Sequence, residues 1–246
     1  MNAPRTRVQR RPVHGVLLLD KPLGFSSNQA LQKAKWLLSA EKAGHTGTLD
    51  PLATGLLIVL VGPCTKLQER LQGFDKSYSG TIRLGVRTDT GDRTGKVLEE
   101  KPLPSLDLAA VRAAAASLVG TLEAPAPAYS AVKHEGRPLY AYARAGQAVP
   151  VKTRTTTVRA FEIAAWTPPE AAFLVACSSG TYVRTLAELL GERLASGGTV
   201  SSLRRESVGP FALAQALPLD AWRAMAPEEL SRRLSESLPA LERALR

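Results

Sequence analysis

The chain has 246 residues, of which 44% are hydrophobic, so it is not disordered by composition and can form one large domain or two small ones. Its 32 basic and 22 acidic residues give a net charge of +10. This excess favours a polyanionic partner such as RNA, DNA or an anionic membrane, although a basic solvated surface would give the same count.

Cysteine usage and hydropathy indicate where the protein is located and which kinds of site it can contain. Neither of the two cysteines, Cys64 and Cys177, has a second cysteine at zinc-site spacing, and we expect both to be buried free thiols. The longest apolar run, residues 56–61, is too short to cross a bilayer, and no apolar signal segment follows the basic N-terminus. The sequence therefore predicts a cytoplasmic protein with no membrane segment and no metal site.

The N-terminal part of the chain alternates polar and apolar segments. Residues 1–13 carry arginines and no acidic residue, which predicts a flexible basic arm. Residues 14–20 are typical of a short buried strand. Ser26 or Ser27 can then cap a helix that runs to about residue 39.

A glycine-rich loop over residues 44–50 precedes Pro51 and an interior strand at residues 56–61. Residues 78–86 alternate in polarity, with Tyr78 on the apolar side, which predicts a half-buried strand. Residues 88–95 are polar and rich in turn-forming residues.

The second half continues with an alanine-rich helix that Asp107 caps and Gly120 ends. Prolines and glycines bound residues 124–150, which we interpret as an excursion from the core. Two strands at about 156–166 and 171–177 and a helix at about 181–195 follow.

A short strand at about 200–203 and a charged, helix-prone tail from residue 220, interrupted by Pro239, complete the chain. Strands and helices are mixed without a regular β-α-β alternation. This pattern favours an α+β domain with a mixed, largely antiparallel sheet flanked by helices over a doubly wound fold.

Asp50 is the first candidate for chemistry. Because Pro51 disfavours helical geometry at the preceding residue, the carboxylate stands on an extended turn from which it can project into a cleft. An Asx-turn, or a cap on a helix that starts at Pro51, would explain the same residue. His45 has no partner at metal-ligand spacing. Residues 91–97 lack the spacing of a phosphate loop, so we interpret this segment as a turn.

Three of the five tyrosines lie in the excursion among basic residues, a mixture that suits stacking on RNA bases and neutralising phosphates. The set comprises Tyr129, Lys133, Arg137, Tyr140, Tyr142 and Arg144. The same rings could instead pin the excursion to the domain. Tyr182 and Arg184 open a helix but are two residues apart, so they do not share a face, and Arg184 could be an ordinary surface cation.

Several blocks in this order resemble the bacterial tRNA pseudouridine-55 synthases, the TruB family, over about residues 14–220. These blocks are Lys21-Pro22-Leu23-Gly24, GHTGTLDPLATG at residues 44–55, Lys76-Ser77-Tyr78, LGVRTD at 84–89, YSAVK at 129–133, YAYAR at 140–144 and SGTYVRT at 179–185.

The resemblance implies roles for residues of these blocks. Asp50 corresponds to the catalytic aspartate, Tyr78 to a tyrosine that stacks on the target base, and Arg184 to an arginine that pairs with the aspartate. Tyr182, Lys21 and Leu203 fall at supporting positions, and His45 corresponds to a histidine that helps to hold the remodelled RNA loop.

The resemblance also implies an organisation and a partner. We expect a basic arm (1–13), a pseudouridine synthase catalytic domain (14–220) with an RNA-gripping insertion (124–152), and a short helical tail (221–246), too short for a full C-terminal PUA domain. The expected partner is the T stem-loop of tRNA, and we expect a monomer that needs neither metal nor organic cofactor.

Two other classes of function remain open at this point. A non-catalytic tRNA-binding or tRNA-folding protein would explain the charge and the tyrosines, but it gives no reason for Asp50 and Arg184 together. A hydrolase that uses Asp50 would release free uracil, but no second carboxylate stands at a suggestive position.

Overall fold

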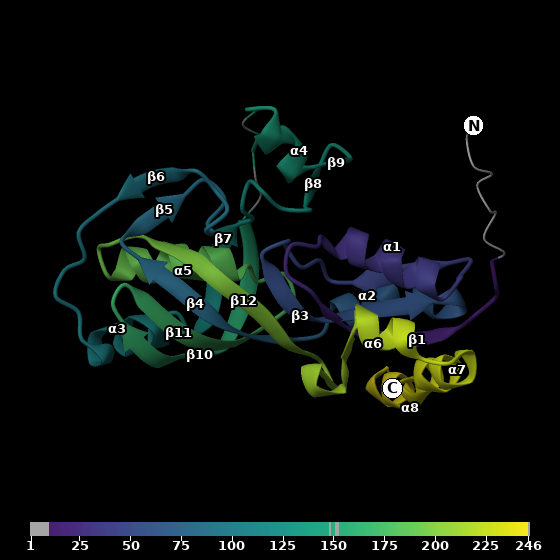
Figure 1. The fold of residues 1–246 in the computed structure, drawn as a ribbon. Coiled ribbons are helices and arrows are strands. Elements are labelled where there is room, and N and C mark those ends of the chain that lie inside the picture. Colours follow the sequence, from purple (N-terminus) through teal and green to yellow (C-terminus); the bar gives the residue numbers. More distant parts are fainter. Residues whose placement is uncertain (1–9, 148, 151–152, 246) are drawn as a thin grey trace, which may run out of the picture. The chain divides into compact units, whose positions relative to one another are not determined.

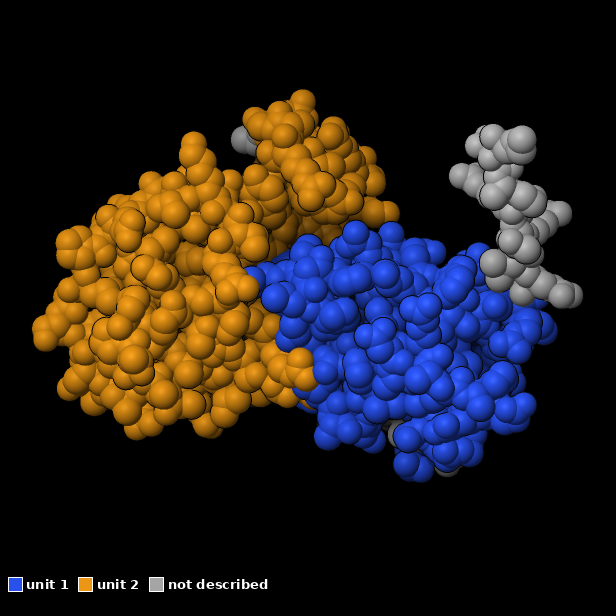
Figure 2. All heavy atoms as spheres, in the orientation of Figure 1, with its two compact units in different colours: residues 1–73, 207–246 blue, residues 74–206 orange. Residues whose placement is uncertain are grey.

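The structure is a computed structural model that describes residues 10–147, 149–150 and 153–245. The chain divides into two compact units, residues 1–73 with 207–246 and residues 74–206, which Figure 2 shows in blue and orange. Residues 1–9 of the predicted basic arm and residues 148, 151 and 152 of the predicted insertion lie outside the described part. The predicted boundaries at residues 13 and 220 stay predictions.

The first unit is built around strand β3, whose central residues are fully buried. Its strands are β1 (Gly15–Lys21), β2 (Ala43–Thr46), β3 (Ala53–Val61), β13 (Phe211–Ala212) and β14 (Leu217–Pro218). Its helices are α1 (Ser27–Leu37), α2 (Gln68–Gln72), α6 (Leu219–Ala224), α7 (Pro227–Glu236) and α8 (Leu238–Ala244), with 3-10 turns η1 (Gly62–Leu67) and η2 (Leu213–Gln215).

Strand β3 pairs antiparallel with β1 along its length and with β2 near its end, while β14 runs parallel to β1. Helix α1 begins where the sequence predicts it. Ser26 is its N-cap in a reciprocal capping box with Gln29, which satisfies two backbone N–H groups of the first turn. The buried face of α1 packs into the same hydrophobic cluster as β1, β3 and the C-terminal helices.

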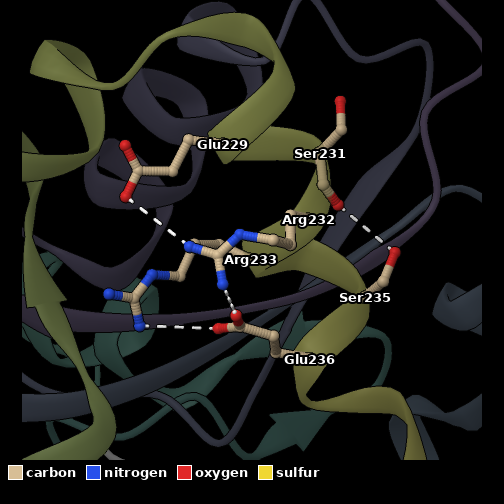
Figure 3. A network of polar contacts seen from close by, with 6 residues as sticks. All are labelled: Glu229, Ser231, Arg232, Arg233, Ser235 and Glu236. Carbon is tan, nitrogen blue, oxygen red and sulfur yellow. Dashed lines mark hydrogen bonds and ion pairs between the residues drawn. The ribbon is translucent and has the colours of Figure 1, made fainter.

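The predicted helical tail is present as α7 and α8, and Pro239 lies in the first turn of α8, where proline is tolerated. Leu230 and Leu234 of α7 are buried in the core of the unit. On the outer side of α7, Arg232 forms ion pairs with Glu229 and Glu236 (Figure 3). Exposed pairs of this kind contribute at most about 0.5 kcal/mol each, so the buried leucines carry the docking.

The second unit contains a sheet in the order β12-β4-β11-β10-β7. These strands are β4 (Lys76–Leu84), β7 (Gly120–Pro125), β10 (Thr153–Thr167), β11 (Glu170–Cys177) and β12 (Gly198–Val208). The remaining elements are β5 (Val86–Thr88), β6 (Val97–Glu100), α3 (Leu108–Ala116), β8 (Lys133–His134), β9 (Arg137–Pro138), α4 (Leu139–Arg144) and α5 (Val183–Arg193).

The strand β4 alternates as predicted, with Tyr78, Ile82 and Leu84 buried. The prediction for β12 was too short, because the charged residues that follow Leu203 do not resemble a strand interior. Arg205 is nevertheless almost completely buried, at 1% exposure, and the strand continues to Val208.

The cysteine prediction is half right. Cys177 is buried in β11, and burial raises the pKa of its thiol to about 11, which is typical of an unreactive thiol. Cys64 is only half-buried, because it lies in the 3-10 turn η1, which has no buried residue.

The predicted excursion is a distinct substructure within the second unit. A hairpin of two short strands, β8 and β9, with two residues each, leads directly into α4. These elements project from the sheet of their unit (Figure 1). Leu139 is buried at its centre. The mixed sheets and their helices confirm the predicted α+β class. Among the described residues, no helix is long and apolar enough to cross a membrane.

Gly80 tests the contact between β4 and β12. A Cβ atom at this position would lie 2.2 Å from the carbonyl oxygen of Ser202 on β12. We therefore expect Gly80→Ala to push the strands apart and to lower the free energy of unfolding by about 1–3 kcal/mol, measured by urea denaturation. Gly73→Ala is the control, because its Cβ would meet no atom closer than 3.3 Å. Equal stability of the two variants would contradict this packing.

Candidate active site

Hydrogen bonds to its backbone groups fix the loop that carries Asp50. Ser27 Oγ accepts a hydrogen bond from the Leu49 N–H at 2.7 Å and donates one to the Leu49 carbonyl at 3.0 Å. The Asp50 carbonyl accepts from the N–H of Ala53 at 3.0 Å, which closes a turn over Pro51. The chain then enters β3, so the alternative in which Asp50 caps a helix is wrong. Asp50 itself is half-buried.

Lys21 and His45 belong to the same unit as Asp50. Lys21 is completely buried at the end of β1, where its Nζ donates to the carbonyls of Pro22 at 3.0 Å and Phe25 at 2.5 Å. Lys21, to which the resemblance gives a supporting position, therefore stabilises the turn after β1. His45 is half-buried on β2 and pairs in register with Val59 of β3.

Arg184 is not a surface cation. Its side chain is 4% exposed, in the first turn of α5, and its guanidinium donates hydrogen bonds in two directions. Nη1 donates to the carbonyl of Thr90 at 2.7 Å, and Nη2 donates to the carbonyl of Tyr129 at 2.8 Å. One cation therefore ties the polar loop after β5 to the base of the excursion through two backbone carbonyls.

Two acidic residues near Arg184 were not predicted as site residues. Asp92, in the loop interpreted as a turn, is 5% exposed, and its Oδ1 accepts hydrogen bonds from Thr90 and Thr94. Glu188 lies one turn after Arg184 on α5, where burial raises the pKa of its carboxyl against the opposing charges of Arg87 and Arg184. Its position four residues after Arg184 was the available signal.

Tyr78 lies in β4, 8% exposed, in register with Val175 of β11. Lys76, two residues earlier, points to the same side of the strand and is also buried. Burial, followed by the charge of Arg205, lowers the pKa of Lys76 to about 8. The face of β4 that carries Tyr78 thus also carries a buried lysine, a feature that the alternating pattern did not predict.

Tyr182 and Leu203 are placed differently. Tyr182 is the N-cap residue of α5, with extended backbone geometry. Only Arg184 belongs to the helix, so the side chains of Tyr182 and Arg184 can point in different directions. Tyr182 lines a hollow with Arg154, Thr156 and Thr185. Leu203 is half-buried in β12.

The aromatic and basic residues of the excursion pair with one another. The Arg137 guanidinium lies 4.7 Å from the centre of the Tyr142 ring, and that of Arg144 lies 5.4 Å from the Tyr140 ring. The Tyr142 hydroxyl donates to the carbonyl of His134 at 3.2 Å, so this ring stabilises the excursion internally. Tyr140 is 40% exposed, Lys133 is exposed and Tyr129 is half-buried.

The predicted site residues thus come from both units. Asp50, Lys21 and His45 belong to the first, and the second contributes Tyr78, Tyr182, Arg184, Leu203 and the excursion. Within the part of the chain that the structure describes, no group of three histidine, cysteine, aspartate or glutamate side chains is arranged to hold a metal ion.

Solved structures share this fold. A Cbf5-Nop10-Gar1 complex matches with a TM-score of 0.68 and 25% identity, over 89% of this chain and 59% of that chain. The archaeal box H/ACA sRNP Nop10-Cbf5 complex matches with a TM-score of 0.67 and 23% identity, over 93% and 62% of the two chains. The chain thus spans about 60% of the length of these structural relatives.

Sequence comparison then gives the family. The profile of the TruB family pseudouridylate synthase N-terminal domain matches residues 35–183. The tRNA pseudouridine synthase B of Burkholderia mallei is 53% identical over 95% of this chain and 75% of that protein. The corresponding protein of Xanthomonas campestris pv. campestris is 48% identical over 90% and 72% of the two chains. The chain belongs to the TruB family and is a pseudouridylate synthase.

Ser27 offers a test of how the Asp50 loop is held. Ser27→Ala removes the buried hydroxyl and leaves the N–H and carbonyl of Leu49 without this partner, which should cost about 1–3 kcal/mol of stability and slow pseudouridine formation. Ser26→Ala, which removes the N-cap at a cost of about 1 kcal/mol, is the control, because it leaves the Asp50 loop untouched. Urea denaturation and single-turnover rates give the two readouts. Equal rates for the two variants would contradict the role of Ser27.

Proposed function

We propose that this protein converts uridine to pseudouridine at position 55 in the T loop of tRNA, with Asp50 as the catalytic carboxylate. The identity of 53% with a tRNA pseudouridine synthase B, over 95% of this chain, carries the proposal for the substrate. The position in the T loop and the role of Asp50 rest on the resemblance of residues 44–55 to the family's catalytic block. We further propose a cytoplasmic monomer that needs no metal or organic cofactor.

The reaction requires the uracil to leave its sugar, rotate and rejoin through C5. A base stacked inside a loop cannot rotate, so it must first be flipped out, at a cost of a few kcal/mol. Stacking on the buried Tyr78 ring would recover part of this cost. Enclosing walls would keep the detached base close to the sugar, so that bond re-formation is effectively intramolecular.

The carboxylate must be ionised in order to act as a nucleophile or a base. Burial raises the pKa of a carboxyl group, whereas a nearby guanidinium lowers it. We propose that Arg184 pairs with Asp50 and keeps it charged at neutral pH. The rigid hold on Arg184 supports this role, because a preorganised cation needs no reorientation during the reaction.

The excursion, with the predicted insertion 124–152, would grip the RNA. Its exposed groups are of the kinds that bind RNA: Tyr140 offers a ring for stacking, while Lys133, Arg137 and Arg144 are exposed cations. His45 and Tyr129 would complete the RNA contacts. The net charge of +10 suits the same partner.

Asp50→Asn tests the catalytic role, because the amide keeps the shape of the side chain and loses its charge. We expect single-turnover pseudouridine formation, measured by tritium release from C5-labelled uridine in a T-loop hairpin, to fall by more than about 1000-fold. Hairpin affinity should stay within about threefold. Asp107→Asn is the control, because asparagine also caps α3. Appreciable release by Asp50→Asn would reject the role.

Tyr78→Phe separates stacking from proton transfer. Phenylalanine retains the ring, so hairpin binding should be unchanged, whereas loss of the hydroxyl should slow the reaction by about 100-fold if Tyr78 takes the C5 proton. Quenched-flow measurement of pseudouridine formation gives the rate. A normal rate would eliminate Tyr78 as the proton acceptor and leave it only the stacking role.

The two rival functions predict different products. A non-catalytic tRNA-binding protein would form no pseudouridine over many turnovers, and a hydrolase would release free uracil. Mapping pseudouridine in cellular tRNA with and without this protein, together with chromatography of the reaction products, distinguishes all three functions.

A further inference from the structure

Arg205 is a buried cation that the proposed mechanism does not use. It lies in β12, is 1% exposed and is the largest fully buried side chain among the described residues. Burial lowers the pKa of its guanidinium, so its charge is held at an energetic cost. A methionine or leucine would fill such a position without this cost.

The Arg205 guanidinium is hydrogen bonded to the side chain of Tyr78, and the Tyr78 oxygen favours its charged form. The two residues belong to neighbouring strands, β12 and β4, whose pairing brings Gly80 against the Ser202 carbonyl. Both side chains are buried, at 1% and 8% exposure. The phenol is therefore held in one place by a cation on the adjacent strand.

We propose that Arg205 is a positioning residue for Tyr78, which orients the phenol and stabilises its phenolate form for removal of the C5 proton. This inference rests on the proposed function of Tyr78. A neutral phenol is a very weak base, so a tyrosine that accepts a proton must act as phenolate, and a cation bonded to its oxygen favours that form.

The proton transfer moves one proton from C5 of the base to the Tyr78 oxygen. When the ring carries no bond to the enzyme, the C5–H bond breaks and its electron pair forms the C5–C6 double bond. The π electrons of the N1–C6 double bond move to N1, which takes a proton from water. The proton goes to the Tyr78 phenolate oxygen, which becomes a neutral phenol hydrogen bonded to the Arg205 guanidinium. Arg205 stays protonated throughout and touches neither the RNA nor the reacting carbon in this scheme.

The first test titrates Tyr78 in the free protein and does not depend on catalysis. The chain has only five tyrosines, so 13Cζ-tyrosine NMR gives few signals, and loss of one in Tyr78→Phe assigns Tyr78. We expect Arg205→Met to move the titration of Tyr78 to higher pH. Arg205→Gln, which keeps a hydrogen-bond donor and lacks the charge, should move it in the same direction.

Arg159→Met is the matched control, because it also removes one positive charge from this unit, but from an exposed side chain paired with Asp75. It should leave the titration of Tyr78 unchanged. If Arg205→Met does not fold, as judged by circular dichroism, the titration in Arg205→Gln decides. An unchanged titration of Tyr78 in the folded Arg205 variants would overturn the proposal.

The second test measures the reaction against pH. We expect Arg205→Met to lower kcat by about 10- to 100-fold at neutral pH with little change in KM, because only proton transfer is impaired. The loss should diminish as pH rises, since more phenolate then forms without help. A merely structural role predicts a loss that does not recover with pH, and that result would also overturn the proposal.

The failure of the proposed function would look different. If the unmodified protein forms no pseudouridine in a T-loop hairpin while the titration of Tyr78 still depends on Arg205, the activity assignment fails and the link between Arg205 and Tyr78 stands. If the protein is active and Tyr78 titrates independently of Arg205, only the inference about Arg205 fails.

Discussion

The burial of positive charge against oxygen acceptors is the constraint on which this structure depends. Lys21, Arg184 and Arg205 are each almost fully buried, and each is held by backbone carbonyls or a phenol. The proposed mechanism places Arg184 beside the Asp50 carboxylate and Arg205 beside the Tyr78 oxygen, and these roles would give the burial a functional reason despite its cost.

Backbone anchoring gives the loops of the site their rigidity. A single serine hydroxyl holds Leu49 next to Asp50, and a single guanidinium holds the carbonyls of Thr90 and Tyr129. Both anchors originate in the first turn of a helix, α1 or α5, which is itself packed into a hydrophobic core. Rigid anchoring of each loop suits a catalytic role, because small displacements of reacting groups reduce a reaction rate strongly.

Much of the fold follows from local rules. The capping serine before α1, the alternation in β4, the Asp107 cap of α3 and the proline in the first turn of α8 are each confirmed, because hydrogen bonds or periodicities within a few residues decide them. The full length of β12 escaped prediction, because the burial of Arg205 depends on the neighbouring strand β4. Asp92 near Arg184 was missed because its burial depends on distant residues, whereas the spacing of Glu188 from Arg184 was a local signal that was not used.

The sequence by itself determined the fold class, the family and the segment that carries Asp50, because ordered motifs and short-range periodicity are written in the chain. Only the tertiary structure decided that Arg184 and Arg205 are internal cations, that Tyr78 has a guanidinium partner and that Tyr142 stabilises the excursion from within. The physical reason is that the burial and partners of a long polar side chain are set by residues distant in sequence, such as 78 and 205, which meet only when the strands pair.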